Sequence, residues 1–176
     1  LSGSTLFGTT INGGANDRGV VFKINTDGTG FTKLLDFDGV NGSQPFGSLT
    51  LIGPTLYGMT YGGGLNLKGV IFKINTDGTN FTKLFDFDGI PNGANPYGSL
   101  TLSGSTLFGM TYKGGTSDFG TFFKLNIDGS GYTLDKLLDF DGTNNGSYPQ
   151  GTFYELNSAL YSVTNEGGSY HGGTIF

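Results

Sequence analysis

The chain contains no cysteine, which excludes disulfides, thiolate metal sites and a thiol nucleophile. Charged residues make up only 13% of the 176 residues, and the nine basic ones form no run typical of a surface for nucleic acid or anionic membrane. Apolar runs are short, and none approaches the ~18 residues of a membrane-spanning helix. We therefore expect no nucleic-acid partner, no membrane span and no cofactor.

Glycine and aromatic residues are abundant instead. The 34 glycines are about one residue in five, against ~7% in an average protein. They do not recur at every third position, which excludes collagen. The 16 phenylalanines and 9 tyrosines supply enough apolar surface to argue against disorder. We therefore expect the glycines to serve turns and close approaches in a compact β protein.

Internal repeats organise the chain. A six-residue segment, TLFGTT in its first copy, recurs with changes at residues 5–10, 55–60, 106–111 and 159–164. A second segment, GVVFKIN, recurs at residues 19–25, 69–75 and 120–126 and begins again at Gly173. Its phenylalanines lie 50, 51 and 53 residues apart, at Phe22, Phe72, Phe123 and Phe176. The spacing indicates about three and a half copies of a unit of roughly fifty residues.

Each repeat predicts four short strands. In the second copy these cover residues 47–51, 55–60, 69–75 and 81–87, lengths that suit strands and not helices. An Asn-Thr-Asp-Gly turn joins the last two strands of a repeat, and Asp-Gly is a strong hairpin signal because glycine accepts positive φ. The third copy of the last strand carries two extra residues, Leu134 and Asp135.

The predicted strands are apolar on both faces, and this decides between β architectures. Phe22 and Ile24 share one face of the third strand, yet Val21 on the opposite face is also apolar. A strand that is apolar on both sides must be covered on both sides, as blades around an axis are. We predict an all-β, β-propeller-like array of four-stranded antiparallel blades. It forms one repeat domain over residues 1–176, with repeats at about 1–46, 47–97, 98–150 and 151–176.

The blocks STLYGxTxxGG and GTxFKINTDGTxFTKLxDFDG resemble the GloVer tandem repeat, which occurs in large bacterial surface and secreted proteins. The resemblance covers essentially the whole chain, and the strand layout is also similar to that of kelch blades. It implies a propeller-like fold and an extracellular or cell-surface location, and it brings no catalytic residues. The last copy departs from the pattern at Ala159, Ser162, Val163, Asn165 and Glu166.

The chain begins between the first two strands of a repeat and stops within a third strand. The first and last blades are therefore expected to be incomplete, which leaves three interpretations. The chain is a fragment of a longer array, it assembles with other copies through unpaired edges, or flanking residues are missing from the sequence.

Asp-Phe-Asp-Gly is the most regular polar feature of the repeats. Its carboxylates are Asp36, Asp38, Asp86, Asp88, Asp139 and Asp141. Two strand residues apart, the carboxylates of one pair lie on the same side and could hold a hard cation such as calcium. The spacing does not fit the Asp-x-Asp-x-Asp-Gly calcium loop. We therefore favour the alternative, in which each aspartate accepts backbone N–H bonds in the turn to the next blade.

Aromatic residues in the loops between the second and third strands are the candidate binding residues. These loops carry Tyr61, Tyr112, Lys113, Tyr170 and His171. Such loops gather at one end of a propeller, where exposed aromatic rings could stack on sugars. Ordinary loop packing is the alternative.

Three functions follow, in order of preference. The first is a non-catalytic extracellular scaffold that self-associates through strand edges or packs on neighbouring repeats, and the second is a carbohydrate-binding propeller. A polysaccharide-degrading enzyme is third. It would need Glu155 and Glu166 as a carboxylate pair, or a triad built on His171, the only histidine, which no Gly-x-Ser-x-Gly motif supports.

Overall fold

The computed structural model describes residues 2–127 and 131–176. Within these residues every regular element is a β-strand, and no helix is long and apolar enough to cross a membrane. The chain divides into two compact units, Leu1–Asp86 and Phe87–Phe176. Each unit is described by itself below.

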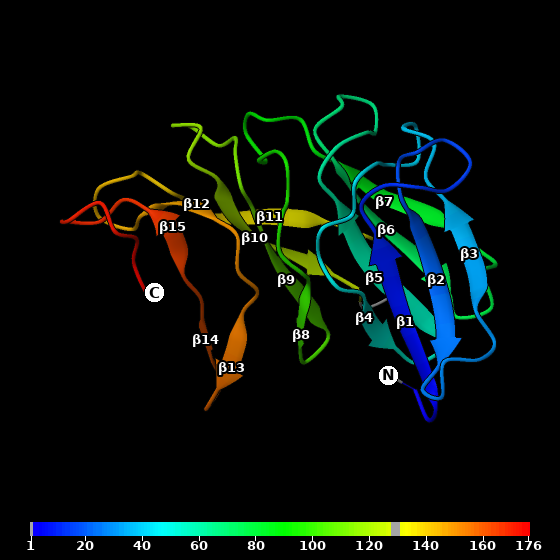
Figure 1. The fold of residues 1–176 in the computed structure, drawn as a ribbon. Helices are drawn as coiled ribbons and strands as arrows, with labels where there is room; N and C mark the ends of the chain where they lie inside the picture. Colours follow the sequence, from blue (N-terminus) through cyan, green and yellow to red (C-terminus); the bar gives the residue numbers. More distant parts are fainter. Residues whose placement is uncertain (1, 128–130) are drawn as a thin grey trace. The chain divides into compact units, whose positions relative to one another are not determined.

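Unit 1 contains two antiparallel sheets whose strands follow chain order (Figure 1). The first sheet is three-stranded, with β1 (Thr5–Thr10), β2 (Val20–Asn25) and β3 (Thr32–Asp36). The second is four-stranded, with β4 (Thr50–Ile52), β5 (Thr55–Thr60), β6 (Val70–Asn75) and β7 (Thr82–Asp86). The four strands predicted for the second repeat are therefore confirmed, in the predicted order.

Unit 2 repeats the four-stranded sheet and then departs from it. The sheet holds β8 (Thr101–Ser103), β9 (Thr106–Thr111), β10 (Thr121–Asn126) and β11 (Leu134–Asp139). The last repeat forms two separate ladders. One pairs β12 (Ser147–Pro149) with β15 (Thr164–Glu166), and the other pairs β13 (Tyr154–Leu156) with β14 (Ala159–Tyr161). The strand predicted over residues 159–164 is thus divided between β14 and β15.

In the intact repeats, the second strand carries a glycine opposite a phenylalanine of the third strand. The last repeat lacks this glycine, which explains why its second strand is divided. Gly58 on β5 pairs with Phe72 on β6, and a Cβ at Gly58 would lie 2.6 Å from the ring carbon Cζ of Phe72. The last copy has Ser162 at this position, opposite Phe176. The Ser162 hydroxyl is buried and has no hydrogen-bond partner among the described residues. The close ring-on-glycine contact of the other copies is therefore lost where the strand breaks.

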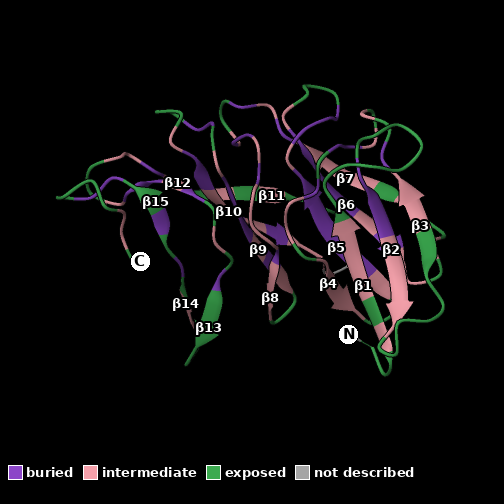
Figure 2. Cartoon of the chain, viewed as in Figure 1, coloured by how far each residue is buried: buried purple, intermediate pink, exposed green. Residues whose placement is uncertain are grey.

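Each unit has an aromatic core between its sheets. In unit 1 the fully buried side chains of Val21, Phe37, Leu56 and Phe72 pack into one cluster. In unit 2 Met110, Phe140 and Phe153 form another. Figure 2 shows β5 and β6 largely buried, whereas β13 is exposed along its whole length. The central strands are covered on both faces, as their apolar pattern predicts.

The last strand of each three- or four-stranded sheet is poorly suited to pairing with another chain. β3, β7 and β11 each pair with their neighbour through a register shift that marks a β-bulge. Each also carries a lysine paired with an aspartate three residues later. These pairs are Lys33–Asp36 (2.6 Å), Lys83–Asp86 (2.9 Å) and Lys136–Asp139 (2.7 Å). Bulges and edge lysines are devices that natural sheets use against edge-to-edge association.

Candidate functional site

The first aspartate of Asp-Phe-Asp-Gly ties down the loop of its own blade. Asp36 accepts a hydrogen bond from the Ala15 backbone N–H at 2.8 Å, and Asp86 accepts one from Leu65 at 2.7 Å. The ion pair with Lys33 and the Ala15 N–H hold the pKa of Asp36 below its ordinary value. Burial alone would raise the pKa of Asp139, but hydrogen bonds from Lys136 and Thr116 outweigh it and the net shift is downward.

The second aspartate caps the turn that follows the strand. Asp38 accepts from the backbone N–H groups of Val40 and Asn41, both at 2.8 Å. Asp141 accepts from the side-chain amide of Asn144 and from the backbone of residues 143–145. These hydrogen bonds, the Asn144 amide first, lower the pKa of Asp141 far below its ordinary value. The described residues contain no group of three acidic or histidine side chains placed to hold a metal ion.

The glycine of the motif joins one repeat to the next. The Gly64 N–H donates to the Gly39 carbonyl at 2.8 Å, and the Gly168 N–H donates to the Gly142 carbonyl at 3.2 Å. The turn after one blade is thereby fixed to the Gly-Gly loop of the following blade. The four residues of the motif therefore have separate structural roles: loop anchor, buried core ring, turn cap and contact with the next repeat.

A surface cleft opens at this contact in each unit, at equivalent positions of the repeats. The cleft of unit 1, about 430 Å³, is lined by Arg18, Asp38, Gly39, Val40, Gly64, Leu65, Leu67 and Lys83. The cleft of unit 2, about 340 Å³, is lined by Phe119, Asp141, Gly142, Thr143, Ser147, Tyr148, Glu166, Gly167 and His171. Arg18 and Phe119 occupy the same repeat position, as do Leu67 and His171. The two units thus have a cleft at the same place in the repeat, lined by different side chains.

Aromatic rings gather at the cleft of unit 2. Phe119 and Tyr148 meet edge to face, with their ring centroids 5.5 Å apart. The row continues from Tyr148 to Tyr112 at 5.1 Å and from Tyr112 to Tyr97 at 6.3 Å. All four side chains are half-buried, so each ring is held by its neighbours while part of its surface meets solvent.

Tyr148 is held in a backbone conformation that bulky residues rarely adopt. Its φ is 54°, in the left-handed region, and the equivalent residues Gln44 and Asn95 have φ of 55°. Asparagine tolerates this region well, whereas a large aromatic residue there is an outlier. Backbone strain of this kind persists where the surrounding structure over-determines it, and it clusters at functional sites. The tyrosine is therefore placed at the cleft against its local preference.

A model of the Gloeobacter/Verrucomicrobia repeat matches residues 1–176, the whole chain. The chain belongs to this repeat family. No curated protein matches it. The family membership agrees with the GloVer resemblance of the sequence blocks.

Solved structures similar to this Gloeobacter/Verrucomicrobia repeat chain are propeller-like. A chain of the nidogen/laminin complex has a TM-score of 0.62 and 22% identity, with 92% of this chain and 51% of that chain covered. A putative TolB from Agrobacterium tumefaciens has a TM-score of 0.55 and 14% identity, with 99% and 54% covered. An ancestral GH74 enzyme has a TM-score of 0.56 and 16% identity, with 98% and 24% covered.

These likenesses show the fold alone, because the identities are low. The chain spans about half the length of the nidogen/laminin and TolB chains that it matches. The fold is all-β and β-propeller-like, with four-stranded antiparallel blades and incomplete first and last blades.

The binding residues predicted from the sequence lie at several places in this repeat chain. Tyr61 lies in unit 1, where its ring meets Phe46 edge to face at 5.4 Å. Tyr112 joins the aromatic row of unit 2, and His171 lines the cleft there. Tyr170 is 96% exposed, and Lys113 pairs through its backbone with Ala94.

Sequence reasoning missed three members of the aromatic row: Tyr97, Phe119 and Tyr148. A signal for two of them was present. Phe119 stands where the first two copies have Arg18 and Lys68, and Tyr148 stands where they have Gln44 and Asn95. Departures from the repeat that introduce an aromatic ring mark this cleft better than the repeated tyrosines do.

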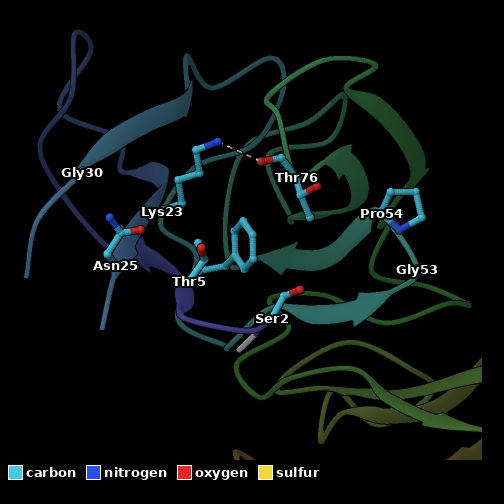
Figure 3. Close-up of a pocket in the computed structure, with 9 residues that line it drawn as sticks. Ser2, Thr5, Lys23, Asn25, Gly30, Gly53, Pro54 and Thr76 are labelled. Atoms are coloured by element: carbon cyan, nitrogen blue, oxygen red, sulfur yellow. Dashed lines mark hydrogen bonds between the residues drawn. The ribbon is translucent and has the colours of Figure 1, made fainter. Parts of the chain in front are cut away.

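A further hollow of about 490 Å³ lies in unit 1 among hairpin turns and strand ends (Figure 3). Lys23 reaches across it and donates to the Thr76 carbonyl at 3.5 Å. Ser2, Thr5 and Asn25 supply most of the remaining polar wall. Because small polar side chains and backbone groups line this hollow, we interpret it as a solvated gap between turns.

Proposed function

We propose that this chain is a non-catalytic, extracellular carbohydrate-binding module of a bacterial repeat protein. The observation that carries the proposal is the row of half-buried aromatic rings that starts at the cleft of unit 2, where Phe119 and the strained Tyr148 form part of the wall. Binding sites combine apolar and aromatic walls with a few placed polar groups. Glu166 and His171 supply such polar groups beside the rings.

The shape of the cleft supports a sugar ligand. A pyranose ring has a C–H face that packs on an aromatic ring, and hydroxyl groups around its edge that need hydrogen-bond partners. Phe119 and Tyr148 offer rings at a steep angle to one another, and Glu166 offers an acceptor. The cleft volume of about 340 Å³ is at the small end of ligand pockets and suits one or two sugar units.

The surroundings of the carboxylates favour a binding function over a catalytic one. Asp141 is held ionised by its turn hydrogen bonds, whereas a glycosidase general acid needs a raised pKa. Glu155 lies on β13 and accepts a hydrogen bond from the Ser103 hydroxyl at 3.0 Å, whereas Glu166 lines the cleft. The likeness to a GH74 enzyme concerns the fold and brings no catalytic pair to these positions.

A Tyr148→Ala variant is expected to bind glycans about fivefold more weakly, because losing a packed ring removes on the order of 1 kcal/mol. Affinity electrophoresis with soluble β-glucan, xylan and galactomannan would first find a polymer that the wild-type chain binds. Tyr161→Ala, which removes an exposed ring from β14, is the control and should bind as wild type does. Equal loss in both variants, or no binding to any polymer, would count against the aromatic cleft.

Self-association through strand edges is a second proposal, favoured by one observation. β13 is exposed along its length, and Tyr154 (69% exposed) and Leu156 (50%) present apolar surface there. An exposed strand is a template for pairing between chains, and the two apolar side chains on one of its faces add surface for that contact. The bulges and lysines on β3, β7 and β11 argue against pairing at those edges and place this function second.

Light scattering after size exclusion, over a hundredfold range of concentration, tests the second proposal. If β13 pairs between copies, the mass should rise with concentration, and Leu156→Lys should reduce that rise because a lysine blunts an edge. Ile90→Lys, at an exposed turn residue outside the strands, should leave the mass unchanged. A constant monomer mass for the wild type would remove this function.

A further inference from the structure

Arg18 is the only arginine of the chain, and it stands at the wall of the unit 1 cleft. Its guanidinium forms no ion pair with any described residue. The other cation of the cleft, Lys83, is already paired with Asp86 at 2.9 Å. Arginine is fully charged at neutral pH and presents a planar fork of donors that matches a carboxylate in two parallel hydrogen bonds. A free guanidinium at a cleft is therefore a recognition group for a carboxylate.

The floor beside Arg18 is aliphatic and strongly exposed. Val40 is 73% exposed, Leu65 81% and Leu67 74%. Three neighbouring branched side chains on one small surface form an apolar patch of the kind that marks interaction sites. The ligand that fits must therefore combine a carboxylate with an apolar face.

Leu67, like Tyr148, has a backbone conformation that is unfavourable for its side chain. Its φ is 58°, in the left-handed region, where a branched residue is disfavoured. The first and third repeats have Asp17 and Asp118 at this position, and each accepts a hydrogen bond from a loop glycine N–H at 2.8 Å. A leucine cannot make that bond, so the second repeat gives up a loop contact and gains an apolar wall for the cleft.

The charge of unit 1 also permits an anionic ligand. The net charge of the chain is −5, but it is unevenly divided. Unit 1 holds six basic and six acidic residues, whereas unit 2 holds three basic and eight acidic ones. Asp38 lies in the cleft lining, and its Oδ1 atom is already occupied by the N–H groups of Val40 and Asn41. An anion that binds at Arg18 is therefore not repelled by a net negative charge of unit 1.

We propose that the unit 1 cleft binds a uronic acid residue of an acidic polysaccharide. Arg18 holds the carboxylate, and the sugar ring lies with its C–H face on Val40, Leu65 and Leu67. An acidic polysaccharide is favoured over an acidic peptide because the cleft of unit 2 is proposed to bind a glycan, and because one polymer chain offers Arg18 the same acidic unit many times. This inference rests on the proposed glycan-binding function and assigns the class of sugar.

Isothermal titration with polygalacturonate and with its fully methyl-esterified form tests the inference. The wild-type chain should bind the acid polymer at least about tenfold more tightly than the ester, since esterification removes a charge-assisted, two-pronged hydrogen bond. Arg18→Gln should lose this preference, and Arg18→Lys should keep part of it. Lys68→Gln removes the same charge at the equivalent position of the next repeat and should stay within about twofold of wild type. Circular dichroism and thermal unfolding confirm that each variant is folded.

The outcomes separate this inference from the proposed function. Equal affinity for acid and ester, or an unchanged Arg18→Gln variant, overturns the uronate site and leaves the aromatic cleft of unit 2 standing. Acid-specific binding that depends on Arg18 but not on Tyr148 supports the uronate site, and the aromatic cleft is then decided separately by the electrophoresis with neutral polymers. Failure of the wild type to bind polygalacturonate overturns the inference, and Arg18-dependent binding of polyglutamate in that case would identify an acidic peptide as the occupant.

Discussion

Gly63→Ala is expected to destabilise unit 1 by about 3 kcal/mol or more, a large part of the 5–15 kcal/mol that holds a domain folded. Two effects add. Gly63 has φ of 76°, where a Cβ costs about 1–2 kcal/mol. The new Cβ would also lie 2.6 Å from the Gly39 carbonyl oxygen and 2.6 Å from the Gly42 carbonyl carbon. Both are backbone atoms of the preceding turn, so neither can move aside without breaking the Gly64–Gly39 hydrogen bond.

Gly13→Ala is the matched control for this prediction. Gly13 occupies the same position one repeat earlier, with φ of 85°, but a Cβ there would meet no atom within 4 Å. The Gly13→Ala variant should therefore lose only about 1 kcal/mol of its free energy of unfolding, which is the cost of a Cβ in the left-handed backbone conformation. Urea unfolding followed by circular dichroism gives both values. Equal losses in the two variants would mean that the contact between successive repeats contributes little to stability.

The repeat spacing predicted the blades well because the same geometry is imposed at each copy. Every Phe of Asp-Phe-Asp-Gly is fully buried, at Phe37, Phe87 and Phe140. The turn-capping interpretation of the aspartates also has its hydrogen bonds in the structure. In these positions the local turn chemistry and the packing of the blade require the same residue, so the pattern in the sequence is informative.

The candidate sites were harder to predict because they lie where the chain departs from the repeat. Phe119 and Tyr148 are separated by almost thirty residues in the sequence, and in the fold the Tyr148 backbone N–H donates to the Phe119 carbonyl at 2.9 Å, which brings their rings together. The division of the second strand in the last repeat was equally hard to predict from the sequence. Ser162 differs from glycine by one small group, yet it stands at a position where the other copies tolerate no Cβ.

Repeated and unrepeated residues therefore serve different purposes in this chain. The glycines, the core phenylalanines and the paired aspartates recur because each blade needs them. Arg18, Phe119 and Tyr148 occur once at their repeat positions, and all three line a cleft. The two proposed sites are consequently separable from stability. Substitutions at Arg18 should change binding while leaving the unfolding curve in place, and substitutions at the repeated glycines should do the reverse.

Gly58→Ala is expected to destabilise the chain by about 1–3 kcal/mol through overpacking, although alanine is intrinsically the better strand residue. Its Cβ would lie 2.6 Å from Cζ of Phe72 and 2.8 Å from Cδ2 of Leu49, and the Phe72 ring is fully buried. Gly172→Ala is the control, because a Cβ there meets nothing within 4 Å and φ is not positive. That variant should be neutral or slightly stabilised, by up to about 1 kcal/mol.

The double variant Gly58→Ala with Phe72→Leu identifies the source of the loss. Leucine lacks the Cζ atom that meets the new methyl group, so the double variant should be less destabilised than the sum of the two single variants. A coupling of about 0.5–3 kcal/mol is expected for residues in direct contact. Additivity within about 0.5 kcal/mol would show that the ring is not what excludes a side chain at Gly58. Coupling would instead make the glycine–phenylalanine pair a single packing unit, whose loss at Ser162 accounts for the broken strand of the last repeat.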